Sequence, residues 1–93
     1  MSTQKDIKNL DTAALAHLSG SSRVVGAKQI RKALQAGSAQ KVFLAQNADP
    51  ALTEPLEALC RQKRVELIWI RSMKDLGSAC GIEVGAAAAA IVA

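Results

Sequence analysis

The stretch RVVGAKQIRK, residues 23–32, contains the transition that decides the fold of this 93-residue chain. Its first three residues form a short run that is typical of a strand, and Gly26 provides a turn. Apolar residues then recur at helical spacing, which predicts a helix over residues 27–36 with one apolar and one basic side. Gly37 fits the left-handed position at which many helices end. The stretch therefore predicts a strand, a turn and a helix in succession.

Strands and helices continue to alternate downstream of this helix. Apolar runs at 41–46 and 65–70 predict two strands, the first of them buried on both faces. Helical spacing predicts a helix from residue 53 to near residue 64, and a short one after Ser72. Strands that alternate with helices in this way predict an α/β fold, an α/β/α sandwich.

The starts of the two later helices are predicted from their capping residues. Thr53 is a favoured N-cap, and Pro55 falls in the first turn, where its missing N–H costs nothing. Ser72 and Asp75 have the spacing of a capping box, and Gly81 is expected to end that helix. The apolar stripe of the helix after Thr53 is predicted to be Leu52, Leu56, Leu59 and Cys60.

The two ends of the chain need separate arguments. Five consecutive alanines at 86–90 favour a helix by propensity, but the sequence stops too soon after Gly85 for a useful one. We therefore expect a strand of small residues there, packed closely under helices. Near the other end, helical spacing predicts an N-terminal helical segment within 1–20, ahead of a core over 23–93. We find no linker or repeat and expect 1–93 to be one domain.

Composition excludes several classes of protein. Hydrophobic residues make up 49% of the chain, which is typical of a packed protein and not of a disordered one. Phe43 and Trp69 are the only aromatic residues, which disfavours a protein that stacks bases on rings. No signal peptide is evident, and the longest apolar run, 85–93, is shorter than the roughly 20 residues that a bilayer requires. We expect a cytoplasmic protein with no membrane partner.

The cysteines and the single histidine offer little for catalysis. Cys60 and Cys80 lack the spacing of metal ligands and are expected to be two small buried thiols. A catalytic thiol needs a base or a cation beside it, and the sequence shows no such partner for either. His17 falls at a helical surface or boundary position, also without a catalytic partner. We therefore expect no enzyme activity, no bound metal and no cofactor.

The net charge of +4 is concentrated in one part of the chain. No acidic residue lies between Asp11 and Asp49, whereas the remainder carries seven basic and eight acidic residues. The basic residues of the acid-free stretch are Arg23, Lys28, Arg31, Lys32 and Lys41. Such a concentration of charge is expected where a protein binds phosphates, although a solvated helix face produces the same pattern.

The start of the helix predicted over 27–36 holds the first candidate binding residues. A helix N-terminus presents free N–H groups and a partial positive charge, which attract phosphate. Lys28 and Lys32 share a face of that helix, and Gln29 lies beside them. Lysine donates to guanine O6 and N7, and glutamine both donates and accepts at a base edge. Many basic helices begin in this way, so the pattern alone is not specific.

A second candidate element is the glycine-punctuated stretch at 76–87. It carries the apolar residues Ile82 and Val84 on either side of Glu83. Apolar residues in such a loop either fill the core or form a wall for an unstacked base, and the sequence leaves both open.

Four motifs together resemble one known family. They are GAKQIRKA at 26–33, ADP at 48–50, SMKDLG at 72–77 and CGIEVGAA at 80–87. In this order and spacing they resemble the L7Ae family of ribosomal and RNA-binding proteins, most closely its small bacterial members. The resemblance implies a three-layer α/β/α sandwich around a four-stranded mixed sheet. It also implies binding to the kink-turn, a sharply bent RNA helix with a bulge and tandem sheared G·A pairs.

The resemblance also assigns roles by position. The family's recognition helix would begin after Gly26, and Gly26 and Ala27 are counted among its RNA-binding residues. The family's loop for a flipped-out bulge nucleotide falls on 82–84, with Glu83 at its centre. The residues placed at the major-groove edges of the sheared G·A guanines are Lys28, Gln29 and Lys32. Arg23 and Arg31 would contact phosphates by position only.

The sequence departs from the family pattern at one point. Archaeal and eukaryotic relatives carry Asn-Glu where this chain has Lys28-Gln29, the pair expected of the bacterial branch. The substitution keeps donors for guanine O6 and N7 and removes a carboxylate acceptor for its N1 and N2 hydrogens.

Two functional hypotheses follow. The first is a ribosome-associated, monomeric kink-turn RNA-binding protein, whose target is large-subunit ribosomal RNA, a riboswitch or another bulged helix. The second is a protein-interaction or structural subunit on the same fold, in which Arg23, Arg31 and Lys32 meet an acidic partner.

Overall fold

The computed structural model describes residues 22–93. The segment predicted over 1–20, with His17, lies outside the described residues. The elements along the chain are β1 (Arg23–Val25), α2 (Ala27–Ala36), β2 (Ala39–Ala45), α3 (Pro50–Lys63), β3 (Glu66–Ile70), α4 (Met73–Ala79) and β4 (Ala88–Val92). Strands and helices alternate in the described part of the chain, as the sequence predicts. No helix in this part is long and apolar enough to cross a membrane.

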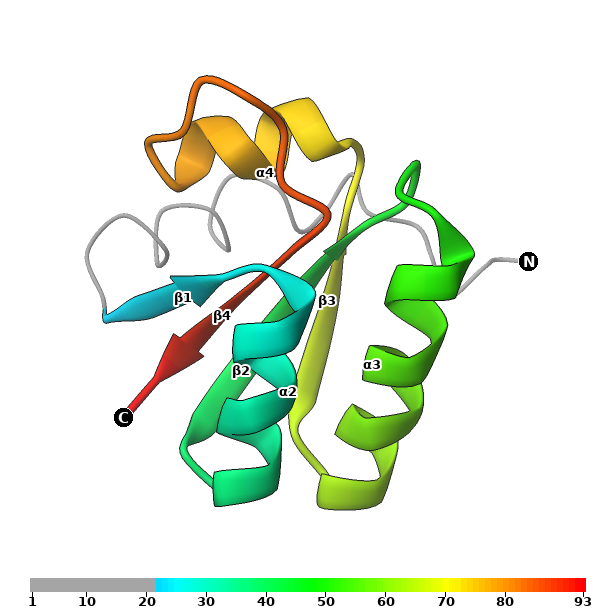
Figure 1. The fold of residues 1–93 in the computed structure, drawn as a ribbon, viewed down its shortest axis with the longest axis vertical. Helices are drawn as coiled ribbons and strands as arrows, with labels where there is room; N and C mark the ends of the chain where they lie inside the picture. The colour runs from blue at the N-terminus through cyan, green and yellow to red at the C-terminus, as the bar shows by residue number, and fades with distance from the viewer. Residues whose placement is uncertain (1–21) are drawn as a thin grey trace.

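The strands form one four-stranded mixed sheet with the order β1-β4-β2-β3 (Figure 1). β2 and β3 run parallel, while β4 runs antiparallel to both β1 and β2. β4 is the last strand along the chain, yet it lies between the first two. This insertion places the beginning of β4 beside the end of β1, where α2 starts.

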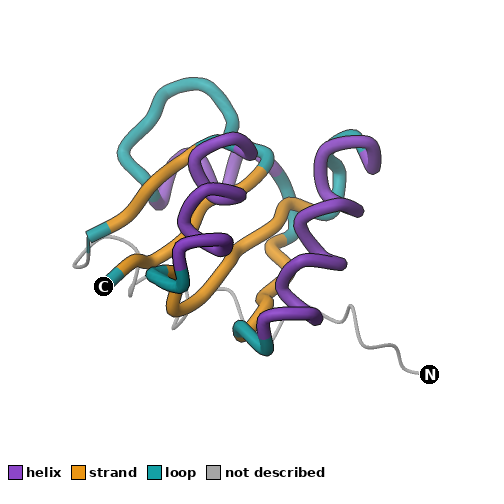
Figure 2. The backbone as a smooth tube through the Cα atoms, turned by 60° about the horizontal axis from the view of Figure 1, so that its bottom comes forward, coloured by secondary structure: helices purple, strands orange, loops and turns teal. Residues whose placement is uncertain are grey.

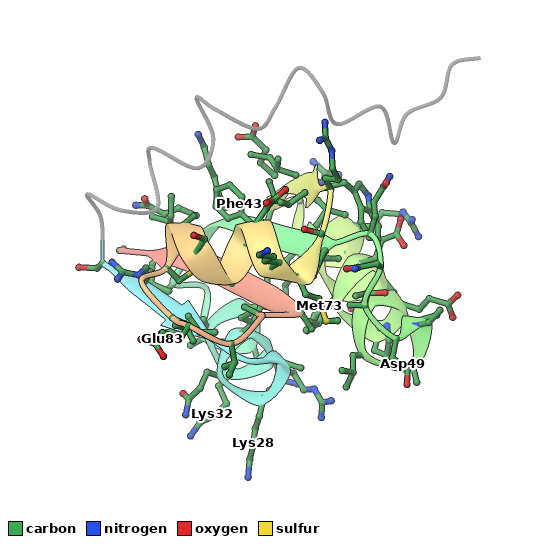
Figure 3. All side chains as sticks on the ribbon, turned by 90° about the horizontal axis from the view of Figure 1, so that it is seen from above. Lys28, Lys32, Phe43, Asp49, Met73 and Glu83 are labelled. Carbon is green, nitrogen blue, oxygen red and sulfur yellow. The ribbon has the colours of Figure 1, made fainter. Side chains whose placement is uncertain are left out.

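The helices cover the sheet in two layers, which confirms the predicted α/β/α sandwich. α2 and α3 lie side by side on one face (Figure 2), and α4 lies on the other (Figure 3). Alternate residues of β2 separate in the same way: Val42 and Leu44 pack toward α2 and α3, and Phe43 and Ala45 pack with α4. β2 is therefore apolar along its buried half, as expected of a strand covered on both faces.

The alanine-rich segment forms a strand, as predicted, although alanine favours helices. Strand β4 begins at Ala88, two residues after the alanine run begins. Ala88, Ala89 and Ala90 are all buried, the middle one on the opposite face from the other two. Burial between two helical layers outweighs the small propensity of alanine for helix. The small side chains allow α2 to pack closely over the strand.

The start of α3 differs from the prediction. The N-cap is Asp49 and not Thr53, because the Asp49 side chain accepts a hydrogen bond from the N–H of Ala51 at 2.9 Å. Pro50 occupies the first helical position, which suits its fixed φ and missing N–H. The helix thus begins earlier than expected, so that Thr53 is buried within it and Pro55 lies inside it as well.

The packing stripe of α3 is partly as predicted. Leu56 and Cys60 are buried and Leu59 is partly buried against the core, whereas Leu52 is 46% exposed. The expectation that Leu52 faces the core is wrong, since Thr53 takes the inward position of the first turns. The other two helices begin and end as the sequence indicates.

Candidate nucleic-acid interface

Gly26 sets the geometry of the α2 start. Its φ of 105° lies in the range that favours glycine, so the chain can turn directly from β1 into the helix. Its carbonyl accepts the first helical hydrogen bond, from the N–H of Ile30 at 3.1 Å. No side chain caps α2, and its first turn contains no acidic residue. The first N–H groups therefore remain available to an external anion, and the positive end of the helix is not neutralised.

The solvent face of α2 carries the predicted polar residues. Ile30 and Leu34 are fully buried, and Ala27 is partly buried against the same core cluster. Figure 3 shows Lys28 and Lys32 pointing away from the molecule on the same side. The exposed residues on this face are Lys28, Gln29, Arg31 and Lys32. The start of α2 thus presents cations and an amide beside open N–H groups.

The 81–87 loop, which joins α4 to β4, lies close against α4. Gly81 has a φ of 77° and reverses the chain after the helix, and the N–H of Ile82 donates to the Gly77 carbonyl at 2.8 Å. A Cβ on Gly77 would collide with the Val84 carbonyl, and one on Gly85 would lie 3.0 Å from the side chain of Met73. The glycines at 77 and 85 therefore permit backbone to pack directly on backbone.

The two apolar residues of the loop, Ile82 and Val84, differ in burial. Ile82 is partly buried and packs against the core cluster that contains Leu76 and Phe43. Val84 is 72% exposed, and Glu83 between them is exposed as well. Ile82 thus contributes to the core, and a role for Val84 as a wall for an unstacked base stays a prediction. The loop offers solvent one aliphatic side chain and one carboxylate.

The start of α2 and the 81–87 loop meet at one end of the sheet. Pairing of β1 with β4 places Val25 opposite Ala89, and the N–H of Gly26 donates to the Ala88 carbonyl at 3.1 Å. Figure 3 shows Glu83, on the loop, on the side of the molecule from which Lys32 and Lys28 project. Two motifs far apart in the sequence therefore lie at the same end of the sheet and on the same side of the molecule.

Comparison with known proteins identifies the family. A sequence model of the Ribosomal protein L7Ae/L30e/S12e/Gadd45 family matches residues 8–93. The chain belongs to this family. The match extends further toward the N-terminus than the motifs in the sequence indicate. The α/β/α architecture is the one that the resemblance to the L7Ae family implies.

Bacterial relatives and a solved structure of the L7Ae type are similar to this chain. An RNA-binding protein of Bacillus pumilus is 49% identical over 69 residues, which cover 74% of this chain and 84% of that protein. The RNA-binding protein YbxF of Geobacillus stearothermophilus is 44% identical over 69 residues, with the same coverage. The structure of the Giardia lamblia 15.5kD RNA binding protein superposes with a TM-score of 0.79 at 26% identity, and covers all of this chain and 78% of its own.

Two of the five basic residues of the acid-free stretch lie apart from the α2 surface of this L7Ae-family protein. Arg23 donates through a terminal guanidinium nitrogen to the Cys80 carbonyl at 2.9 Å, a link that no local sequence pattern indicates. Lys41 lies in β2 opposite Glu66 of β3, toward the far end of the sheet from Gly26. The charge that is concentrated in sequence is therefore divided in space. The phosphate role suggested for Arg23 stays a prediction.

Both cysteines of the chain are free and buried. Burial, with a smaller contribution from the carboxylate of Glu57, raises the pKa of Cys60 to about 11. Burial also raises the pKa of Cys80, although the neighbouring Arg23 opposes the shift. Neither thiol is appreciably ionised near neutral pH, so neither is suited to nucleophilic chemistry. Within residues 22–93 no group of three acidic, His or Cys side chains is placed to hold a metal ion.

Proposed function

We propose that this protein binds RNA, and that it recognises the kink-turn. The observation that carries the proposal is the hydrogen bond between Gly26 and Ala88, which joins the open, basic start of α2 to the first residue of β4, directly after the 81–87 loop. Membership of the L7Ae/L30e/S12e/Gadd45 family and the RNA-binding relatives support it. A helix end beside a loop suits a ligand in which stacked and unstacked nucleotides lie close together.

The α2 start would bind the sheared G·A pairs. The uncapped N–H groups and the helix dipole attract a backbone phosphate. Lys28 and Lys32 project on one side and donate to the O6 and N7 atoms of guanine, and Gln29 donates or accepts at the neighbouring edge.

The 81–87 loop would hold the flipped-out bulge nucleotide. Val84 offers an exposed aliphatic surface for the face of a base, while Ile82 packs against the core cluster. The carboxylate of Glu83 accepts hydrogen bonds from amino groups. This mode requires no aromatic platform, because the protein would recognise a distorted backbone and one extruded base.

A gel-shift titration tests the mode of binding. We expect wild-type protein to bind a kink-turn RNA more tightly than the same RNA in which Watson–Crick pairs replace the G·A pairs. Equal affinity for the two RNAs would overturn the kink-turn proposal while leaving general RNA binding. Binding to neither RNA, together with co-purification of an acidic protein, would favour a protein-interaction subunit on this fold.

A single substitution locates the interface. Lys32→Ala is expected to weaken kink-turn binding by about 1–3 kcal/mol, the usual contribution of one base or phosphate contact. Lys63→Ala is the matched control, because Lys63 ends α3 at the opposite end of the helical layer from the α2 start (Figure 1). Equal losses for the two variants would show that binding depends on net charge and not on α2.

We further propose that the protein is a cytoplasmic monomer whose cellular RNA lies in the large ribosomal subunit or in a riboswitch. The family description and the basic surface support a ribonucleoprotein role. Sequencing RNA that is crosslinked to the protein in cells would identify the target. Crosslinks outside bent, bulged helices would contradict the proposal.

A further inference from the structure

We propose that Arg23 is a positioning residue that fixes the 81–87 loop beside the start of α2, and does not bind phosphate. The positioning of the loop is inferred from the geometry of the protein alone. Its effect on RNA binding rests on the proposed function. It reassigns the residue that sequence position alone places among the phosphate contacts.

The contact joins the first residue of β1 to the C-terminal end of α4. Arg23 begins β1 at the edge of the sheet, and its guanidinium donates to the carbonyl of Cys80, the residue that ends α4, at 2.9 Å. Carbonyls at a helix C-terminus lack helical partners and carry partial negative charge, so a cation is a favourable donor there. Arg23 therefore completes the end of α4.

The guanidinium also lies directly against the turn from which the loop departs. Gly81 follows Cys80 with a φ of 77°, and a Cβ built on Gly81 would lie 3.9 Å from the terminal nitrogen of Arg23. A shift of this turn away from β1 would lengthen the bond from Arg23 to the Cys80 carbonyl. The departing end of the loop is thus held by a side chain from β1.

The returning end of the loop is held by backbone. The N–H of Ala86 donates to the Met73 carbonyl at 2.9 Å, and the Ala88 carbonyl accepts from Gly26 at 3.1 Å. Val84 lies between the two anchored ends and is largely exposed. Backbone bonds hold both ends of the loop, and Arg23 adds a side-chain bond from β1 at the departing end.

Salt dependence distinguishes a positioning residue from a phosphate contact. Each phosphate contact contributes roughly 0.7–0.9 to the slope of log Kd against log salt. Arg23→Met keeps an aliphatic side chain of similar length and should leave this slope unchanged while weakening kink-turn binding several-fold. Arg31→Met is the matched control, since Arg31 is an exposed arginine on α2. This variant should lower the slope by about the contribution of one phosphate contact.

The loop's target provides a second comparison. An abasic site in place of the bulge nucleotide should weaken wild-type and Arg31→Met binding to the same extent. The abasic site should reduce the affinity of Arg23→Met clearly less, because the loop of this variant no longer presents Val84 to the base. A lowered salt slope for Arg23→Met with an unchanged abasic penalty would overturn the inference.

Amide hydrogen exchange tests the positioning without RNA. In Arg23→Met the amides of Gly81 and Ile82 should exchange about tenfold faster, because a charge-assisted hydrogen bond is lost, while those of Phe43 and Leu44 in β2 stay unchanged. Unchanged loop exchange would overturn the inference even if RNA binding falls. Faster loop exchange in a protein whose wild type binds no kink-turn would uphold the positioning and reject the proposed function. If Arg23→Met does not fold, Arg23→Lys, which keeps the charge without the planar guanidinium, must show the same faster exchange and unchanged slope.

Discussion

Two helices, α2 and α3, lie side by side on one face of the sheet and begin at the same end, but their first turns are built differently (Figures 1 and 3). The α3 start is closed: the Asp49 side chain accepts from the N–H of Ala51, and Pro50 has no N–H to offer. The α2 start is open, because Gly26 provides no side chain and no acidic residue follows in the first turn.

The difference separates a helix whose start is closed by its own residues from one whose start is open to a ligand. The carboxylate of Asp49 satisfies an N–H donor of α3 and neutralises its positive end, so an external anion gains little there. In α2 the same groups are left for a ligand, and Lys28 adds a cation beside them. The residue that precedes each helix, Gly26 or Asp49, decides whether its first turn is open or capped.

Reversing a charge at the open start should have the largest effect. Lys28→Glu removes one cation and places a carboxylate beside the proposed phosphate site, so kink-turn affinity should fall by about 3–4 kcal/mol. Isothermal titration at fixed salt would measure the loss. Lys63→Glu at the end of α3 changes the net charge equally and should cost far less. Similar losses for both variants would remove the distinction between the two helices.

A side chain at the α2 turn should affect both stability and binding. Gly26→Ala forces an L-residue to a φ of 105° and should lower the free energy of unfolding by about 1–2 kcal/mol in urea denaturation. It should also weaken RNA binding, because the bond to Ala88 shifts. Gly37→Ala is the matched control, because Gly37 also has a positive φ, of 78°, and lies at the opposite end of α2. A Cβ added at Gly26 or at Gly37 would meet no other atom within 4 Å. Gly37→Ala should lose stability and keep its RNA affinity. An equal loss of affinity in Gly26→Ala and Gly37→Ala would contradict a specific role for the α2 turn.

Opening the closed start should have the smallest effect on function. Asp49→Ala removes the N-cap of α3 and should lower stability by about 1 kcal/mol with no change in RNA affinity. Thermal unfolding and a binding titration on the same samples would measure both. Asp49→Ser keeps a capping oxygen and should recover most of the stability. A drop in affinity for Asp49→Ala at unchanged stability would show that RNA also contacts the α3 start.

Local sequence rules are sufficient for α2, because glycines mark both of its ends. They are not sufficient for α3, because Asp49-Pro50 and Thr53-x-Pro55 both satisfy the pattern of a capped start with an early proline. The earlier start is the one found, since it adds a further turn of helix and lets Thr53 be buried. In β4, the burial of the alanines between two helical layers outweighs the intrinsic helix propensity of alanine.

The features of the candidate site that depend on residues close in sequence were predictable. Those that depend on contacts between residues far apart in sequence were not. The exposure of Lys28, Gln29 and Lys32 follows from helical periodicity. The bond from Arg23 to Cys80 joins residues 57 positions apart, and no spacing rule connects them. Ile82 and Val84 have separate environments because an irregular loop has no period from which burial can be inferred.

The central position of β4 has a consequence for synthesis on the ribosome. β1 and β2 do not pair with each other, and only β4 joins them into one sheet. Pairings between the first and last strands form late and slowly, since a long stretch of chain must be ordered between them. Until β4 has emerged, the α2 start has neither its bond to Ala88 nor the loop beside it. A nascent chain therefore acquires its complete proposed RNA surface only when β4 is paired in the sheet.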